Sequence, residues 1–262
     1  MVDQVHFKPR FAIALAFCAG LLAPSAGLAA DAAAPVYAVM SLVGDNISTE
    51  VFTRVIASRT EGNLKKMLPI ESAVFDQAAV QAANGVVKRQ KPGVKTVLMV
   101  SADKELHLQQ NGMFETVEAN KANREYLQNL LKNRGASRLI LITKYKYDAE
   151  FQVANEHIGS GKIEGLGFYI DNETKLLNNS NFVSANGYVA AYAYAKVRLI
   201  DAATLNVLKE VVVKRSDVNA NYNAPTADAM PWDALTSAQK ITWLQDVLGG
   251  AMDEAIPKLL AP

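Results

Sequence analysis

The chain has 262 residues, of which half are hydrophobic, and it carries 27 basic and 26 acidic side chains. This near-neutral balance excludes the strongly basic surface that binding to nucleic acid or to an anionic membrane requires. The chain has a single cysteine, Cys18, so an internal disulfide framework is excluded as well.

Residues 1–30 have the layout of a secretory signal peptide. A basic start precedes the apolar run FAIALAFCAGLLAPSAGLAA, which ends in small residues. Pro24 interrupts this run, which is therefore short for a membrane-spanning helix of about 20 apolar residues. We predict cleavage after Ala29 or Ala30, a periplasmic or secreted protein, and no transmembrane segment in the mature chain.

Cys18 raises the alternative of an acylated lipoprotein. Phe17 stands directly before it, where a lipoprotein signal normally has glycine, alanine or serine, so we favour the secretory signal. Cleavage also removes Lys8, Arg10 and Asp3, which leaves 25 basic and 25 acidic side chains. The predicted mature protein is neutral and has no thiol for catalysis or metal binding.

The first half of the mature chain alternates between strand and helix patterns. Residues 34–43 and 94–101 are short apolar runs typical of strands, and the first is expected to be covered on both faces. Helical spacing is found at 46–56, 71–89 and 114–136. The residues expected along one side of the second helix are Val74, Ala78, Gln81 and Gly85. Those expected to face the core from the third are Leu127, Leu130 and Leu131, with Gly135 ending the helix.

The second half reads as consecutive strands followed by a helix. Residues 137–153 change midway from apolar on both faces to alternating, and further strands follow within 159–215, joined by short turns. A long loop is expected at about 217–235, and residues 236–260 form an amphipathic helix. We predict one α/β domain over residues 31–262. Its mixed sheet has strand-helix-strand units, an antiparallel meander and a C-terminal helix.

Two passages resemble a family of envelope domains. GASRLILITKYKY is similar to the family's helix ending in Gly-Ala before an apolar strand. KVRLIDAATLNVLKE is similar to its strand, Asp-x-x-Thr-Gly turn and strand. Asp201 and Thr204 match that turn, whereas Leu205 replaces the glycine that commonly supplies a positive backbone angle. The family includes the amino-terminal domain of the Tol translocation protein B, the curli-secretion lipoprotein and activators of penicillin-binding proteins.

The resemblance implies an accessory role in envelope assembly. We therefore predict an exported protein that binds an envelope protein or a cell-wall component, without intrinsic catalysis and without a cofactor. One strand face gathers aromatic and basic side chains typical of binding hot spots. The predicted binding residues are Tyr192, Tyr194, Lys196 and Arg198 on this face, and Tyr222 and Trp232 in the long loop. The alternative is that these amphipathic side chains only cover the sheet or pack beneath the loop.

A second hypothesis is a small-ligand site in the glycine-rich segment 159–171. GSGK lacks the spacing of a phosphate-binding loop. Its glycines, and those that follow, equally fit a turn, a bulge or a close backbone approach. The glycines concerned are Gly159, Gly161, Gly165 and Gly167.

A third hypothesis is a periplasmic hydrolase. His157 would be its base, Ser160 its nucleophile and Asp148 the residue that orients the base. No Gly-x-Ser-x-Gly elbow accompanies them. We expect no metal site, because His107 and His157 lie fifty residues apart and neither belongs to a motif with ligand spacing.

Overall fold

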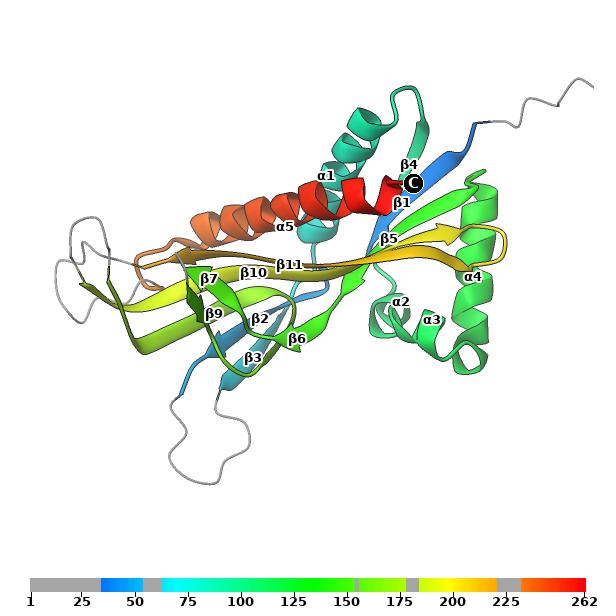
Figure 1. Cartoon of the computed structure of the whole chain (residues 1–262). Helices are drawn as coiled ribbons and strands as arrows, with labels where there is room; N and C mark the ends of the chain where they lie inside the picture. The colour runs from blue at the N-terminus through cyan, green and yellow to red at the C-terminus, as the bar shows by residue number, and fades with distance from the viewer. Residues whose placement is uncertain (1–33, 54–62, 154–155, 178–183, 221–231) are drawn as a thin grey trace, which may run out of the picture. The chain divides into compact units, whose positions relative to one another are not determined.

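Two kinds of strand pairing meet in one mixed sheet (Figure 1). The computed structural model describes residues 34–53, 63–153, 156–177, 184–220 and 232–262, all within the unit Ala34–Pro262. The predicted signal peptide, Cys18, Tyr222 and most of the predicted long loop lie outside the described residues.

The first part of the sheet consists of parallel strands. They are β1 (Val36–Ser41), β4 (Lys95–Val100) and β5 (Arg138–Lys144). β1 lies between the other two and pairs in parallel with each. Its residues are apolar on both faces because both faces of the strand are covered, as the sequence predicts.

The second part of the sheet is an antiparallel meander. It contains β9 (Lys162–Leu177), β10 (Ser184–Asp201) and β11 (Val207–Asn219). β11 pairs along one side of β10, while β9 and β5 share the other side, so β10 joins the two parts. A hairpin of β2 (Asn46–Val51) and β3 (Leu64–Pro69) extends the sheet beyond β9. The predicted mixed α/β sheet is thereby confirmed.

The helix predicted at 46–56 is wrong over Asn46–Val51, which forms β2, and residues 54–56 of that prediction lie outside the described residues. Ser48 and Glu50 are buried between β3 and β9, while Ile47, Thr49 and Val51 occupy the alternate positions. The residues therefore alternate with period two here, in addition to their helical spacing. The strand forms because β3 and β9 pair with the segment on its two sides.

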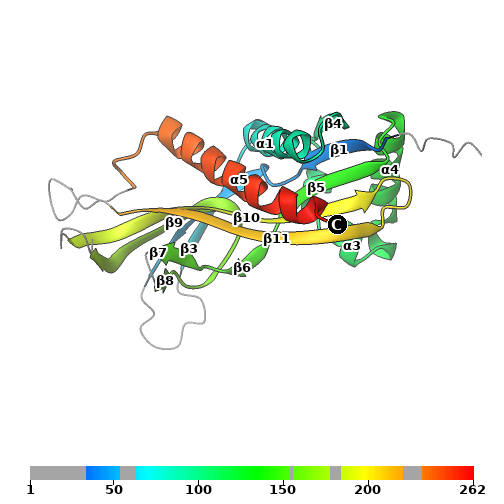
Figure 2. The same ribbon diagram turned by 45° about the horizontal axis from the view of Figure 1, so that its top comes forward.

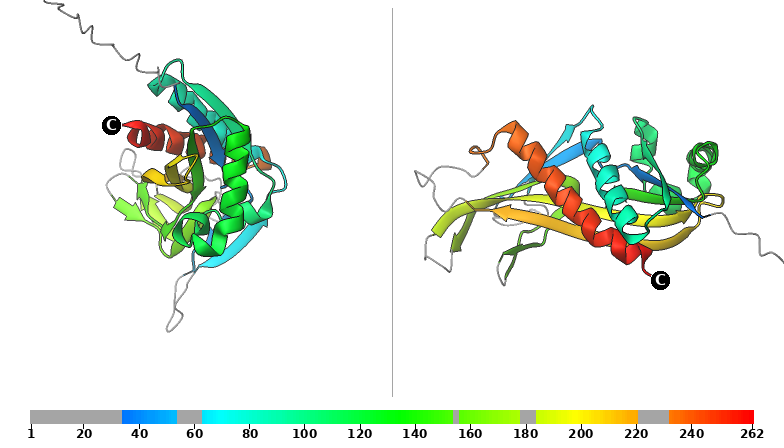
Figure 3. Two further views of the ribbon diagram at one scale, coloured as in Figure 1. Left: turned by 90° about the vertical axis from the view of Figure 1, so that its right-hand side faces the viewer. Right: turned by 90° about the horizontal axis from the view of Figure 1, so that it is seen from above.

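Helices α1 (Val74–Gln90) and α5 (Ser237–Leu260) lie side by side over one face of the sheet (Figure 3). α1 has the predicted span, and its buried face lies next to the side formed by Val74, Ala78 and Gln81. Gln81 is exposed, and the buried stripe runs one position later, through Phe75, Ala79 and Ala83. The stripe of α5 is confirmed from Leu244 onward, and a capping box at Thr236 and Gln239 fixes its start.

The opposite face is covered by short elements (Figure 2). Over the parallel strands these are α2 (Lys104–Leu108), α3 (Gly112–Glu115), the 3-10 helix η1 (Glu118–Asn120) and α4 (Lys121–Asn133). Over the meander they are β6 (Lys146–Asp148), β7 (Phe151–Val153) and β8 (Glu156–Ile158). The single helix predicted at 114–136 is thus divided, although Leu127 and Leu131 are buried and Gly135, with φ of 66°, follows its end as expected.

Candidate functional site

The aromatic side chains expected on an exposed face of β10 lie in the interior. Tyr192 and Tyr194 have no exposed surface, because Phe151 of β7 packs over this part of the strand. The Tyr194 hydroxyl accepts a hydrogen bond from the backbone N–H of Glu150 and donates one to its carbonyl, both at 3.1 Å. The expected exposure is therefore wrong, because a segment distant from β10 in the sequence covers this face.

The basic residues of the same strand are paired within the chain. Arg198 is 1% exposed, and its Nε donates to Glu210 at 2.8 Å and its Nη1 to Asn111 at 3.0 Å. The Lys196 Nζ lies 3.5 Å from a carboxylate oxygen of Glu115 and 3.7 Å from one of Glu210. These charges hold α3 and β11 against β10. This agrees with the alternative stated above, in which the side chains of this strand only cover the sheet.

Trp232 lies on the other side of the sheet from Tyr192. Its ring packs at 5.0 Å from that of Phe168, which is paired in register with Ala191 and faces α5. Neighbouring residues of a strand point to opposite faces, so the sheet itself separates Trp232 from Tyr192. A joint surface of these two residues is not formed.

All four glycines in segment 159–171 allow a close approach of neighbouring chain, as predicted. A Cβ at Gly165, which has φ of 67°, would lie 2.9 Å from the Lys144 side chain. A Cβ at Gly167 would lie 2.2 Å from the carbonyl oxygen of Ser48. Two further positive-φ glycines, Gly159 and Gly161, precede β9. Packing accounts for Gly165 and Gly167, and a ligand role of the segment stays a prediction.

The hydrolase residues are not assembled into a triad. His157 is exposed on β8, whereas the Asp148 carboxylate binds the Lys162 Nζ at 2.7 Å. The Ser160 hydroxyl contacts that of Tyr169 at 3.3 Å. Among the described residues no hydrogen bond joins the three proposed catalytic side chains, although such catalysis requires contacts of about 2.6–3.2 Å.

The topology points to a different site. The connection from β1 to β4 places α1 on one face of the sheet, and the connection from β4 to β5 places α2 to α4 on the other. In open parallel sheets, ligands bind outside the carboxyl ends of the strands where the connections change face. A pocket of about 770 Å³ lies there, and we name it the carboxyl-edge pocket. Its lining includes Asp45, Ile70, Asp76, Ala102, His107 and Leu108.

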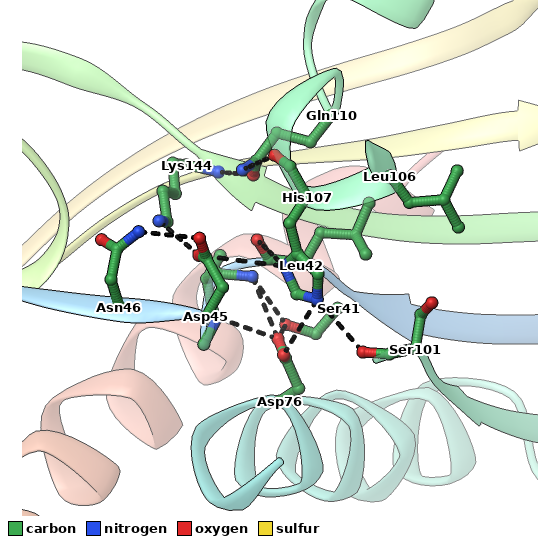
Figure 4. A network of polar contacts seen from close by, with 12 residues as sticks. Ser41, Leu42, Asp45, Asn46, Asp76, Ser101, Leu106, His107, Gln110 and Lys144 are labelled. Atoms are coloured by element: carbon green, nitrogen blue, oxygen red, sulfur yellow. Dashed lines mark hydrogen bonds and ion pairs between the residues drawn. The ribbon is translucent and has the colours of Figure 1, made fainter. Parts of the chain in front are cut away.

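Asp76 ties the first turn of α1 to the end of β1 (Figure 4). Its Oδ1 accepts hydrogen bonds from the Ser41 hydroxyl at 2.6 Å and from the backbone N–H groups of Val43 and Gly44 at 3.0 and 3.1 Å. Burial raises the pKa of this carboxyl group, although these hydrogen bonds and nearby His107 act in the opposite direction. A Cβ at Gly44 would lie 2.8 Å from the Asp76 nitrogen, so glycine allows this approach.

His107 of α2 is buried and held on both sides of its ring. Nδ1 lies 3.1 Å from the carbonyl oxygen of Leu42, and Nε2 lies 3.1 Å from that of Ser101. A carboxylate stands near each nitrogen: Asp45 at 3.8 Å from Nδ1 and Asp76 at 3.9 Å from Nε2. An imidazole ring that carries protons on both nitrogens can donate to both the Leu42 and the Ser101 carbonyl. A neutral ring has a single N–H and can donate to one of them.

A partly buried ion pair closes the inner end of the network. The Lys144 Nζ, at the end of β5, lies 2.5 Å from Asp45 Oδ1. The backbone N–H of Lys144 donates to Gln110 at 2.7 Å, and the Gln110 amide donates to the His107 carbonyl at 2.7 Å. The ends of β1 and β5, α1 and the segment around α2 are therefore connected by polar contacts.

This arrangement positions groups for binding more than for reaction. Both ring nitrogens of His107 face main-chain carbonyls, so neither is free to act as a general base, and the Ser41 hydroxyl donates to Asp76. In the part of the chain that the structure describes, no group of three or more His, Cys, Asp or Glu residues could hold a metal ion.

Sequence reasoning missed Asp76 and considered His107 only as a zinc ligand. Asp76 stands within an apolar helical run, where its contacts with the end of β1 leave no local signal. A weak signal existed, because Asp45 and Asp103 each follow an apolar strand after a few residues, in MSLVGD and MVSAD. Parallel strands place such endings at one edge of a sheet.

No protein-family model matches the chain, and no curated protein matches it. Among solved structures, the chain is similar to the crystal structure of lipoprotein GNA1162 from Neisseria meningitidis. The two are 12% identical, the match covers 83% of this chain and 96% of that one, and the TM-score is 0.27. This likeness carries no argument about function. Among the described helices, none is long and apolar enough to cross a membrane.

Proposed function

We propose that the protein is a non-catalytic accessory protein that binds a small ligand in the carboxyl-edge pocket. The observation that carries this proposal is the pocket itself, which lies where the crossovers change face and has a volume of about 770 Å³. Pockets for small molecules typically measure about 300–1,000 Å³. Convergent polar groups and a carboxyl group with a shifted pKa in such a pocket are features of binding sites.

The walls of the pocket are of two kinds. Asp45, Asp76 and His107 form a polar inner end, and Ile70 and Leu108 add apolar surface. A smaller apolar pocket of about 130 Å³ shares Ile70 with it. A ligand with an apolar body and a polar group directed at Asp45 would use both kinds of wall.

The sequence supports the setting in which this binding would occur. The predicted signal peptide supports export, and the resemblance to envelope domains supports an accessory role beside an envelope protein or a cell-wall component. Fractionation of producing cells would test the first point, because an exported protein is recovered from the periplasm or the medium without its first 29 or 30 residues.

A thermal-shift screen of metabolites, sugars and short peptides tests ligand binding. A compound that binds only the folded state raises the apparent melting temperature. Ala102 lines the pocket and is exposed, and its methyl side chain can form neither a hydrogen bond nor an ion pair. We expect Ala102→Trp to fill the pocket and to abolish the shift caused by a compound that stabilises the wild-type protein.

Ala119→Trp is the matched control, because Ala119 is equally classed as exposed but does not line the pocket. This variant should keep the full shift, and both variants should keep the wild-type circular dichroism spectrum. The proposal is wrong if Ala102→Trp responds to the compound as the wild type does, or if no compound of any class stabilises the wild-type protein.

A further inference from the structure

Besides the three-residue β6, which pairs only with β9, three longer strands of the sheet have a partner on one side only. Within the described ranges, β3 pairs with β2, β11 pairs with β10, and β4 pairs with β1. Such an edge presents free backbone N–H and C=O groups, to which another strand can pair. The side chains of each edge determine how readily that pairing occurs.

Two of these edges carry features that oppose pairing. On β3, Lys65 and Lys66 stand next to each other, and Pro69 closes the strand. On β11, five charged residues and a register shift against β10 interrupt the edge. The charged residues are Lys209, Glu210, Lys214, Arg215 and Asp217. Lysine, proline and irregular register are common protections of free edges.

β4 has no proline and no register shift, and its one charged residue, Lys95, stands at its first position. No charged residue and no proline occur in TVLMVSA, between Lys95 and Asp103. Leu98 is 45% exposed and Val100 is 44% exposed, and their even positions place both on one face of the strand. This edge is therefore apolar and regular in register against β1.

We propose that β4 pairs in antiparallel fashion with β4 of a second copy of this chain. With Met99 opposite the partner's Met99, the register places Lys95 opposite the partner's Asp103. The same register places Leu98 opposite the partner's Val100, so the exposed apolar residues of the two copies cover one another. Lys95 and Asp103 are both exposed, and the Asp103 Oδ1 also accepts hydrogen bonds from the backbone N–H groups of Glu105 and Leu106.

Self-complementarity is the reason for choosing a second copy as the partner. A two-fold contact uses the same surface on both subunits, so each favourable pair occurs twice. Lys95 begins β4 and Asp103 follows the end of the strand as the N-cap of α2, with the apolar residues between them, and only an antiparallel copy inverts that order. The pairing would join two sheets into one continuous sheet.

Analytical ultracentrifugation of the purified protein tests the proposal. We expect a dimer for the wild type and loss of the dimer for Leu98→Lys, which places a charge on the proposed contact. Leu64→Lys is the control, because Leu64 on the protected edge of β3 is 66% exposed and receives the same change. A monomeric wild type, or a dimer that survives Leu98→Lys, overturns the proposal.

Disulfide trapping tests the register independently. In a Cys18→Ser background, oxidised Met99→Cys should form a covalent dimer, because Met99 lies on the proposed two-fold axis. Met67→Cys, in the middle of β3, should stay monomeric under the same conditions. Equal trapping of both variants, or formation of larger aggregates in place of a dimer, contradicts the specific pairing of β4.

Discussion

Two aspartates at opposite ends of the fold make nearly the same contacts and differ in their environment. Asp76 Oδ1 accepts three hydrogen bonds at the end of β1. Asp201 Oδ1 accepts three in the turn between β10 and β11, all at 3.1 Å, from Ala203 and Thr204. Burial raises the pKa of Asp76, whereas hydrogen bonding, chiefly from the Thr204 backbone, lowers the pKa of Asp201. Asp201 also accepts a hydrogen bond from Arg138 at 2.6 Å and is little buried, whereas for Asp76 the loss of solvent outweighs its three hydrogen bonds.

The two turns also differ in what lies beside them. The turn at Gly44 and Asp76 borders the carboxyl-edge pocket, whereas the turn after Asp201 borders a separate pocket of about 340 Å³, lined by Thr204, Leu205 and residues of α4. Leu205 adopts φ of 55° and is buried among the side chains below α4, and Arg124 donates to its carbonyl at 3.4 Å. The positive angle expected of the missing glycine is thus kept, and burial of the leucine side chain offsets the strain.

The largest expected effect is that of Asp76→Ala. The change leaves the Ser41 hydroxyl and the N–H groups of Val43 and Gly44 without their acceptor in a buried place. We expect the free energy of unfolding to fall by about 3 kcal/mol, since each unsatisfied buried group costs about 1–3 kcal/mol. Urea denaturation measures this loss. Asp201→Ala, whose donors can bind water, should lose about 1 kcal/mol, and equal losses would contradict the role assigned to burial.

Leu205 allows a sharper test of the second turn. Leu205→Ala should lower the free energy of unfolding by about 2 kcal/mol, because it removes a buried side chain. Leu205→Gly should lose less, by about 1 kcal/mol, because glycine adopts the positive φ without strain. Within regular structure glycine normally makes a protein less stable than alanine does. If urea denaturation found Leu205→Gly to be less stable than Leu205→Ala, the backbone angle at this position would not be strained.

The smallest expected effect is the opposite pH dependence of the two aspartates. A raised folded-state pKa gives stability that is present below about pH 4 and is lost as the pH rises through the folded value. The stability of the wild type relative to Asp76→Asn should therefore fall as the pH rises from 3 to 7. A lowered pKa acts in reverse, so the stability relative to Asp201→Asn should rise over the same range. Urea titrations at each pH measure both stability differences. If the two differences changed in the same direction with pH, the contrast between Asp76 and Asp201 would be contradicted.

Much of the fold could be read from residue patterns. The apolar runs at β1 and β4, the span of α1 and the meander from β9 to β11 follow from period and turn residues, because these signals are local. The inward face of α1 and the identity of β2 could not be read in this way. Both depend on which neighbouring element covers the segment. The residues of β2 were compatible with a helical spacing and with the period of two that a strand has.

The candidate site was harder to predict than the fold. Aromatic residues on alternate positions of β10 indicate one face of a strand, but they do not show whether that face meets water or β7. Asp76, His107 and Lys144 come from three distant segments, and none belongs to a motif. Their contacts depend on the position of α1 and α2 at the carboxyl edge of the parallel strands.

The sequence by itself determined the secondary structure of most segments, the mixed α/β class and the turn at Asp201, because short-range periodicity and side-chain hydrogen bonds specify them. The tertiary structure alone decided which polar residues are buried together and which strand edge stays free. Burial depends on elements far apart in the chain, and the desolvation that raises the pKa of Asp76 arises only when those elements pack around it.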